Sequence, residues 1–126
     1  MEEHREESGL DINWEYWEKA IRNNGISIDR PKGSRHPRYP DRVYPIDYGY
    51  INNTKGADNE EVDVFVGDTD SGLVGALFTV DRVKNDKEFK FLWNVTKEEA
   101  KAALAFVNFG WQSGEIIWKN GCDRCS

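Results

Sequence analysis

Short alternating segments bounded by turn residues are the feature that most limits what this chain can fold into. In residues 61–66, EVDVFV, valine occupies every second position, and Asp63 and Phe65 lie between the valines. This period of two predicts a strand whose valines face the core and whose other residues face away from it. Residues 73–81 and 88–95 form similar segments, joined by the turn-rich sequence RVKND. Strands as short as these close into a small barrel or pack beneath a helix.

Helices are predicted near both ends of the chain. Residues 12–23 place three large apolar side chains on one helix face, with Asp11 as the expected N-cap and an Asn-Gly pair as the stop. A Thr-x-x-Glu capping box at residues 96–99 begins a helix that runs to about Asn108. Further extended segments are expected at residues 25–29, 43–51 and 115–119.

Length and composition restrict the class of protein. The 126 residues, 38% of them hydrophobic, suffice for a single domain over residues 1–126 in which residues 1–10 form a tail, and the expected fold class is α+β, mainly β. The net charge of −6, from 23 acidic and 17 basic residues, argues against a general nucleic-acid or membrane-surface binder. No apolar run reaches the roughly 20 residues of a membrane span, and the N-terminal residues lack the pattern of a signal peptide, so we expect a cytoplasmic protein.

Carboxylates gather just before and within strand 61–66. Asp58 and Glu60 lie in the preceding turn, and Asp63 points from the strand face opposite the valines. Hard divalent cations such as Mg²⁺, Mn²⁺ or Ca²⁺ prefer all-oxygen sites of this kind, whereas the lack of a nearby His or Cys disfavours zinc. The alternative interpretation is a solvated acidic turn that binds no ion.

A second set of acids lies on the hairpin that follows. Asp81 ends one predicted strand, and Asp86 or Glu88 begins the next. If this hairpin lies beside strand 61–66, these groups reach the same cleft. A site with four or five carboxylates would hold more than one Mg²⁺, which suits the chemistry of phosphate esters and anhydrides.

A basic loop complements the acids. Arginine binds phosphate through two parallel hydrogen bonds, and the three prolines of the loop limit the entropy that is lost when it is fixed. Lys90, two residues past Glu88 on the same strand face, is a further candidate for binding phosphate. The alternative is ordinary pairing between surface charges. The cationic residues of this loop, residues 30–42, are Arg30, Lys32, Arg35, Arg38 and Arg42.

Two motifs together resemble a known family. The segment YPIDYGYI at residues 44–51, followed by DNEEVDVFV at residues 58–66, resembles the signature of the soluble, family I inorganic pyrophosphatases. The match fails at one position, where Glu60 replaces an aspartate. The upstream segment SIDRPKGSRHPRY also resembles this family, in particular short bacterial members, and the whole resemblance covers roughly residues 25–95. It implies a five-stranded, OB-like barrel with an N-terminal and a C-terminal helix packed outside.

The implied activity is the Mg²⁺-dependent hydrolysis of inorganic pyrophosphate to two phosphates, by in-line attack of a metal-bound hydroxide, with Mn²⁺ as an alternative metal. Asp58 and Asp63 would bind the principal metal ions, and Glu60 would be the general base. Asp29 stands where the family has a metal-linked glutamate. The remaining implied roles are metal binding by Asp81 with Asp86 or Glu88, and phosphate binding by Arg38, Lys90 and Tyr48, with Arg35 or Arg42 in place of a hairpin arginine.

The chain departs from the family pattern mainly in its phosphate-binding half. The hairpin expected between Tyr39 and Tyr44 is reduced to PDRV, and the Tyr-Lys pair of the C-terminal helix is replaced by Phe109 and Gly110. These departures support an alternative function, in which the fold acts on another phosphorylated metabolite or retains only metal or phosphate binding. A third hypothesis, a nucleic-acid binder that stacks bases on its aromatic residues, is disfavoured because the carboxylates would repel phosphates on the same face.

Two further features stay open at the level of sequence. Cys122 and Cys125 form a C-x-x-C pair without a second pair to complete a zinc site, and we interpret them as incidental. Trp111 and Trp118 belong either to an interface between copies of the chain or to the core.

Shortening Glu60 tests its assignment as the general base. Because catalysis depends on the distance between the base and the attacking water, Glu60→Asp should change the rate of phosphate release from pyrophosphate by about tenfold or more. A steady-state assay measures this rate, and an unchanged rate would contradict the assignment.

Overall fold

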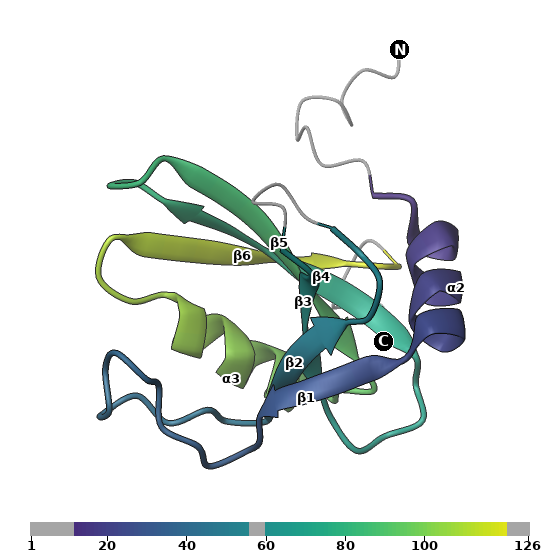
Figure 1. Ribbon diagram of the computed structural model, residues 1–126, viewed down its shortest axis with the longest axis horizontal. Coiled ribbons are helices and arrows are strands. Elements are labelled where there is room, and N and C mark those ends of the chain that lie inside the picture. Colours follow the sequence, from purple (N-terminus) through teal and green to yellow (C-terminus); the bar gives the residue numbers. More distant parts are fainter. Residues whose placement is uncertain (1–11, 56–59, 121–126) are drawn as a thin grey trace.

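The computed structural model describes residues 12–55 and 60–120, and Figure 1 shows two helices packed against a twisted sheet. The helices are α2 (Trp14–Asn24) and α3 (Lys97–Val107). The strands are β1 (Ile26–Arg30), β2 (Asp47–Ile51), β3 (Val62–Val66), β4 (Leu73–Asp81), β5 (Asp86–Trp93) and β6 (Gln112–Trp118). In the part of the chain that is described, no helix is long and apolar enough to cross a membrane.

All six strands belong to one sheet with the order β1-β2-β3-β5-β4-β6. Neighbouring strands are antiparallel except for β3 and β5, which run parallel and place Asp63 opposite Lys90. The α+β, mainly β class predicted from the sequence is therefore confirmed. The sheet has six strands where five were expected, and β1 and β6 lie at its two edges, so the barrel is not closed in the described residues.

The sheet has a hydrophobic core on each face. On one face, Phe65, Leu77 and Leu92 pack with apolar residues of α3. On the other face, Val64 and Phe91 pack near α2. The valines of β3 do face a core, as predicted, but Phe65 is fully buried as well. The expectation that Phe65 lies outside the core is thus wrong, because α3 covers the face on which Phe65 and Asp63 lie.

The helix boundaries follow from local capping interactions. Asn13, and not Asp11, caps α2 through its side chain, which accepts a hydrogen bond of 3.1 Å from the backbone N–H of Tyr16; Asp11 lies outside the described residues. Gly25 ends the helix as predicted. The capping box of α3 is confirmed, because Thr96 and Glu99 exchange hydrogen bonds with each other's backbone at 3.0 and 2.9 Å.

The glycine of the Tyr-Gly-Tyr motif is required by a close approach between two strands. Gly49 of β2 pairs with Ile28 of β1. A Cβ atom at position 49 would come within 2.0 Å of the carbonyl oxygen of Ser27 and 2.8 Å of the Cα of Ile28. These are backbone atoms and cannot rotate away. A glycine at position 49 therefore allows β1 to lie close to β2. Tyr48 is the neighbour of Gly49 in β2.

Replacing this glycine should destabilise the fold. For Gly49→Ala we expect the free energy of unfolding to fall by about 2 kcal/mol or more, because the extra methyl group forces β1 away from β2. Urea denaturation monitored by tryptophan fluorescence measures this loss. Gly110→Asn is a suitable control, since nothing lies within 4 Å of a Cβ at this position and its φ of 62° falls in the left-handed region that asparagine adopts. Equal stabilities of the two variants would contradict the steric argument.

Candidate functional site

Six of the polar residues singled out in the sequence lie on the sheet face that α3 covers. Side chains of directly paired residues point to the same face of a sheet. The pairs Asp63–Lys90, Leu77–Lys90 and Tyr48–Phe65 place these polar groups on the face of the core under α3. By the same alternation, this face also carries Glu88, Asp86 and Asp81. The prediction of a shared face for these side chains is consistent with the observed register.

Lys90 is the centre of a buried polar network on this face. It is 8% exposed, and its Nζ donates to Asp63 Oδ2 at 2.9 Å and to Glu88 Oε1 at 3.2 Å. The hydroxyl of Tyr48 accepts from Nζ at 3.2 Å and donates to Asp63 Oδ2 at 2.7 Å. Both bonds to Asp63 reach the same oxygen, so Oδ1 of this carboxylate takes part in neither of them.

The network fixes the protonation states of its members. Burial disfavours the charged form of Lys90, but Tyr48 and the carboxylates of Asp63 and Glu88 outweigh this effect, so the pKa of Lys90 is raised and its ammonium group stays protonated. Burial raises the pKa of Tyr48 as well, with an opposing contribution from Lys90. Tyr48 is therefore a neutral hydroxyl at physiological pH and acts as a hydrogen-bond donor to Asp63.

The structure places the expected metal ligands in different environments. Asp81 binds its own turn, since its Oδ1 accepts from the backbone N–H groups of Val83 and Lys84 at 3.0 Å each. Asp86 is exposed opposite Asp81. Asp29 lies at a bulge in β1, and its Oδ1 is 3.7 Å from Arg30 Nη1.

The register of β5 separates Asp81 and Asp86 from Asp63. Asp63 pairs with Lys90, and Asp86 lies four residues earlier on β5, which is roughly 13 Å along a strand. In the described residues, no three His, Cys, Asp or Glu side chains gather closely enough to hold a metal ion. Asp58 lies outside these residues. Glu60 lies two residues before the start of β3 and is exposed, with an interaction partner of its own.

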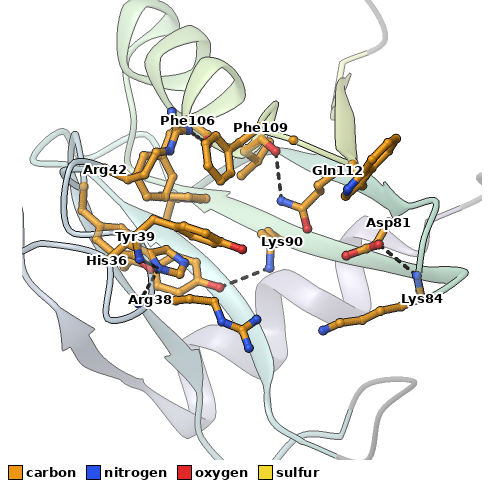
Figure 2. A pocket seen from close by; sticks show the side chains of 16 residues that line it. His36, Arg38, Tyr39, Arg42, Asp81, Lys84, Lys90, Phe106, Phe109 and Gln112 are labelled. Atoms are coloured by element: carbon orange, nitrogen blue, oxygen red, sulfur yellow. Dashed lines mark hydrogen bonds between the residues drawn. The ribbon is translucent and has the colours of Figure 1, made fainter.

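A cavity of about 330 Å³ opens above the network, between the basic loop, the β4–β5 turn and the connection from α3 to β6 (Figure 2). Lys90 and Tyr48 line it together with three further cationic residues, Arg38, Arg42 and Lys84. In Figure 2 the side chains of Arg38 and Lys84 extend toward each other from opposite sides of the cavity. Positive charge from three separate elements therefore converges on one space, which is suited to an anionic ligand.

The basic loop is held in place by His36. Its Nδ1 accepts hydrogen bonds from the backbone N–H groups of Arg38 and Tyr39, at 3.1 and 3.3 Å, and its ring stacks on Tyr44 with a centroid distance of 6.1 Å. Burial lowers the pKa of His36, and Arg30, Arg42 and Arg38 lower it further. The neutral imidazole is therefore the form that keeps Nδ1 available as an acceptor.

The arginines of the loop differ in their contacts. Arg42 donates to the carbonyl of Phe106 at the end of α3, and its guanidinium lies 4.2 Å from the ring centroid of Phe109. Arg35 donates to the carbonyl of Pro40 at 3.0 Å and does not line the cavity. Of the expected phosphate-binding arginines, Arg38 thus has the clearest access to the cavity, whereas Arg42 mainly fixes its wall.

Two polar residues of the cavity were not predicted from the sequence. Lys84 lies in the turn RVKND between Asp81 and Lys90, and the sequence of a turn does not indicate which part of the protein it faces. Gln112 begins β6 opposite Asp81, and its Nε2 donates to the carbonyl of Val107 at 2.9 Å. No pattern in the sequence distinguishes this glutamine from a surface residue.

The lowered pKa of His36 predicts how stability depends on pH. The native pKa lies below the ordinary value of 6.5, so the unfolded chain binds more protons in the interval between the two values. The stability that neutral His36 contributes is fully present above about pH 6.5 and is lost as the pH falls through its native pKa. Urea denaturation between about pH 7.5 and about pH 5 should show a steeper loss for the native chain than for His36→Asn. Asparagine can accept the same backbone hydrogen bonds but does not titrate, so parallel curves would contradict the assignment.

Similarity to known proteins identifies the family of this chain. A family model described as inorganic pyrophosphatase matches residues 3–115. No curated protein matches the sequence of the chain. Among solved structures, the chain is similar to an inorganic pyrophosphatase from Neisseria gonorrhoeae, with 18% identity, a TM-score of 0.52, and coverage of 72% of this chain and 80% of that one. It is also similar to an inorganic phosphatase from Anaplasma phagocytophilum, with 18% identity, a TM-score of 0.50, and the same coverage of both chains.

The two structural similarities show a shared fold, and the family match extends over nearly all of the sequence. The chain belongs to the inorganic pyrophosphatase family, whose members are hydrolases that split pyrophosphate.

Proposed function

We propose that this chain hydrolyses inorganic pyrophosphate to two phosphates in the cavity above Lys90, in a reaction that depends on Mg²⁺ or, as a substitute, Mn²⁺. Enzymes of this family generally use a divalent metal ion such as Mg²⁺. The observation that carries the proposal is the network of Tyr48, Asp63 and Lys90 at a cavity that Arg38 and Lys84 also line. It joins a partly exposed carboxylate to a set of cations, and the substrate needs both.

Asp63 is the described residue best suited to hold a metal ion. Its side chain is 31% exposed, and its Oδ1 is not used by the bonds to Tyr48 and Lys90. Hard cations prefer carboxylate oxygens, and we propose that Asp63 and Asp58 hold the principal ion. A bound Mg²⁺ would supply charge neutralisation and a lowered pKa for water. Asp81, with Asp86 or Glu88, remains a proposal for further ions, as does Asp29.

The chain's own cations bind the substrate in this proposal. Arg38 has a planar fork that matches two phosphate oxygens, and Lys90 supplies a fixed ammonium group at the cavity. Tyr48 holds Lys90 and Asp63 in place through hydrogen bonds. Its hydroxyl can instead donate its hydrogen bond to a phosphate oxygen of the substrate. Because the pKa of Lys90 is raised, its positive charge persists at alkaline pH.

Glu60 is the proposed general base. It lies two residues before the start of β3 and three residues from Asp63 along the chain. A base in this position accepts the proton of the water that attacks phosphorus. The general-base role needs a carboxylate near the cation-binding residues, and Glu60 stands at the third position of the family signature, where other members have an aspartate.

Replacing Asp63 tests the proposed function. Phosphate release from pyrophosphate should require Mg²⁺, and Asp63→Asn should lower the rate by about 100-fold or more, because the neutral amide is a weaker ligand for a cation. The exposed Asp70 provides a matched control, since Asp70→Asn makes the same chemical change outside the site. Thermal denaturation of both variants shows whether they are folded.

The outcomes separate the candidate functions. Equal rates for Asp63→Asn and Asp70→Asn would overturn the proposed role of Asp63. No phosphate release by the native chain in Mg²⁺ or Mn²⁺ would overturn pyrophosphate hydrolysis itself.

A further inference from the structure

The cavity has an aromatic side that inorganic pyrophosphate does not use. Tyr39, Phe109 and Trp111 line it, and they are 42%, 37% and 65% exposed. Pyrophosphate is polar over its whole surface, so it gains nothing from contact with an aromatic face. A pocket that combines convergent cations with accessible aromatic rings fits a ligand with a phosphate part and a flat organic part.

The rings on one side are already fixed in position. Tyr39 and Phe109 pack edge to face with a centroid distance of 4.9 Å. The guanidinium of Arg42 lies over Phe109 and also over Phe106, at 4.2 and 5.0 Å from the two centroids. This side of the cavity is therefore rigid before a ligand arrives, which limits the entropy that binding costs.

Trp111 differs from the other rings because, among residues 12–55 and 60–120, no other aromatic ring packs against its ring and no cation lies over it. Its backbone is held, since its carbonyl accepts from the backbone N–H of Arg82 at 3.0 Å. A tryptophan this exposed at the edge of a cavity is a stacking surface without a partner.

Gln112 adds a directed polar group next to this surface. Its Nε2 donates to the carbonyl of Val107 at 2.9 Å, and this bond fixes which end of the amide is the oxygen. Figure 2 shows that the oxygen then points to the side of Lys90. It can accept a hydrogen bond from a sugar hydroxyl or from an amino group of a base.

We propose that the cavity binds a nucleoside diphosphate. Its phosphates lie among Arg38, Lys84 and Lys90, its sugar lies near the oxygen of Gln112, and its base stacks on Trp111. The placement of the phosphates rests on the proposed function above, whereas the contact with Trp111 does not. The connection after α3 has Phe109 and Gly110 at the cavity, and neither of them carries a charge. Lys84 supplies positive charge to the same cavity from the β4–β5 turn.

Two ligands that are not hydrolysed test this proposal. Adenosine 5′-(α,β-methylene)diphosphate and methylenediphosphonate carry the same type of phosphonate head, and only the first carries a nucleoside. Titration calorimetry of the full chain in Mg²⁺ should show about tenfold or more tighter binding of the nucleotide analogue, since one stacked base contributes about this much. Equal affinities would overturn the proposal.

Variants then locate the base. Trp111→Ala should lower the affinity for the nucleotide analogue at least about fivefold more than it lowers the affinity for methylenediphosphonate. Tyr16→Ala removes an exposed aromatic ring of α2, distant in sequence from every residue of the cavity, and should change neither affinity. Equal effects of Trp111→Ala on both ligands would overturn stacking at this ring.

Two further outcomes are informative. Trp111 could instead contact a second copy of the chain. In that case sedimentation will show a dimer that Trp111→Ala dissociates, and the nucleotide analogue will bind no more tightly than methylenediphosphonate. This outcome would overturn the proposal. If the native chain releases no phosphate from pyrophosphate but still prefers the nucleotide analogue, the proposed function fails and the nucleotide site stands.

Discussion

The burial of one ammonium group is the constraint on which the rest of the site depends. Lys90 is 8% exposed, and an isolated charge so far from water would be strongly unfavourable. Asp63 and Glu88 neutralise it at 2.9 and 3.2 Å, and Tyr48 completes its hydrogen bonds. Removing one partner from such a group costs about 3–5 kcal/mol, because the other charge is left buried and unpaired. The network therefore ties the chemistry of the site to the stability of the sheet.

The parallel pairing of β3 and β5 brings this network together. It sets Asp63 directly opposite Lys90, and the neighbouring pair of β2 and β3 brings in Tyr48. β2 and β3 contribute one member each and β5 contributes two, so a shift of one residue in either register would send a polar side chain to the core of the other face. Gly49 matters here for a related reason, since it permits the close approach of β1 on the outer side of β2. The register of the strands thus places the residues of the site, and the charges of the site disfavour any other register.

Local signals in the sequence predicted much of the fold. The capping box of α3, the glycine stop of α2 and the alternation in β3 depend on neighbouring residues, and each appears in the structure. The same holds for Lys90 and Glu88, whose spacing of two residues predicted a shared strand face, and the structure adds an ion pair between them. Such features are set within a few residues, so a single sequence contains the information they need.

What could not be predicted depends on long-range pairing. The burial of Phe65 requires α3 to cover the second face of the sheet, and periodicity in β3 alone does not indicate this. The distance between Asp63 and Asp86 depends on the register between β3 and β5, which no local pattern fixes. Lys84 reaches the cavity because the β4–β5 turn faces the basic loop, and a turn sequence does not specify its neighbour in space.

The shortened basic loop shows how the phosphate half of the site is organised in this chain. With few residues between Tyr39 and Tyr44, the loop is stabilised from within by His36 and anchored to α3 by Arg42. An arginine used as an anchor is less available to a ligand, because its guanidinium already contacts a carbonyl and an aromatic ring. The cations that remain at the cavity, Arg38 and Lys84 above Lys90, come from elements far apart in the sequence. Their position depends on the packing of the loop, the hairpin and α3 against one another, so the binding of an anion at this site would stabilise the arrangement of all three.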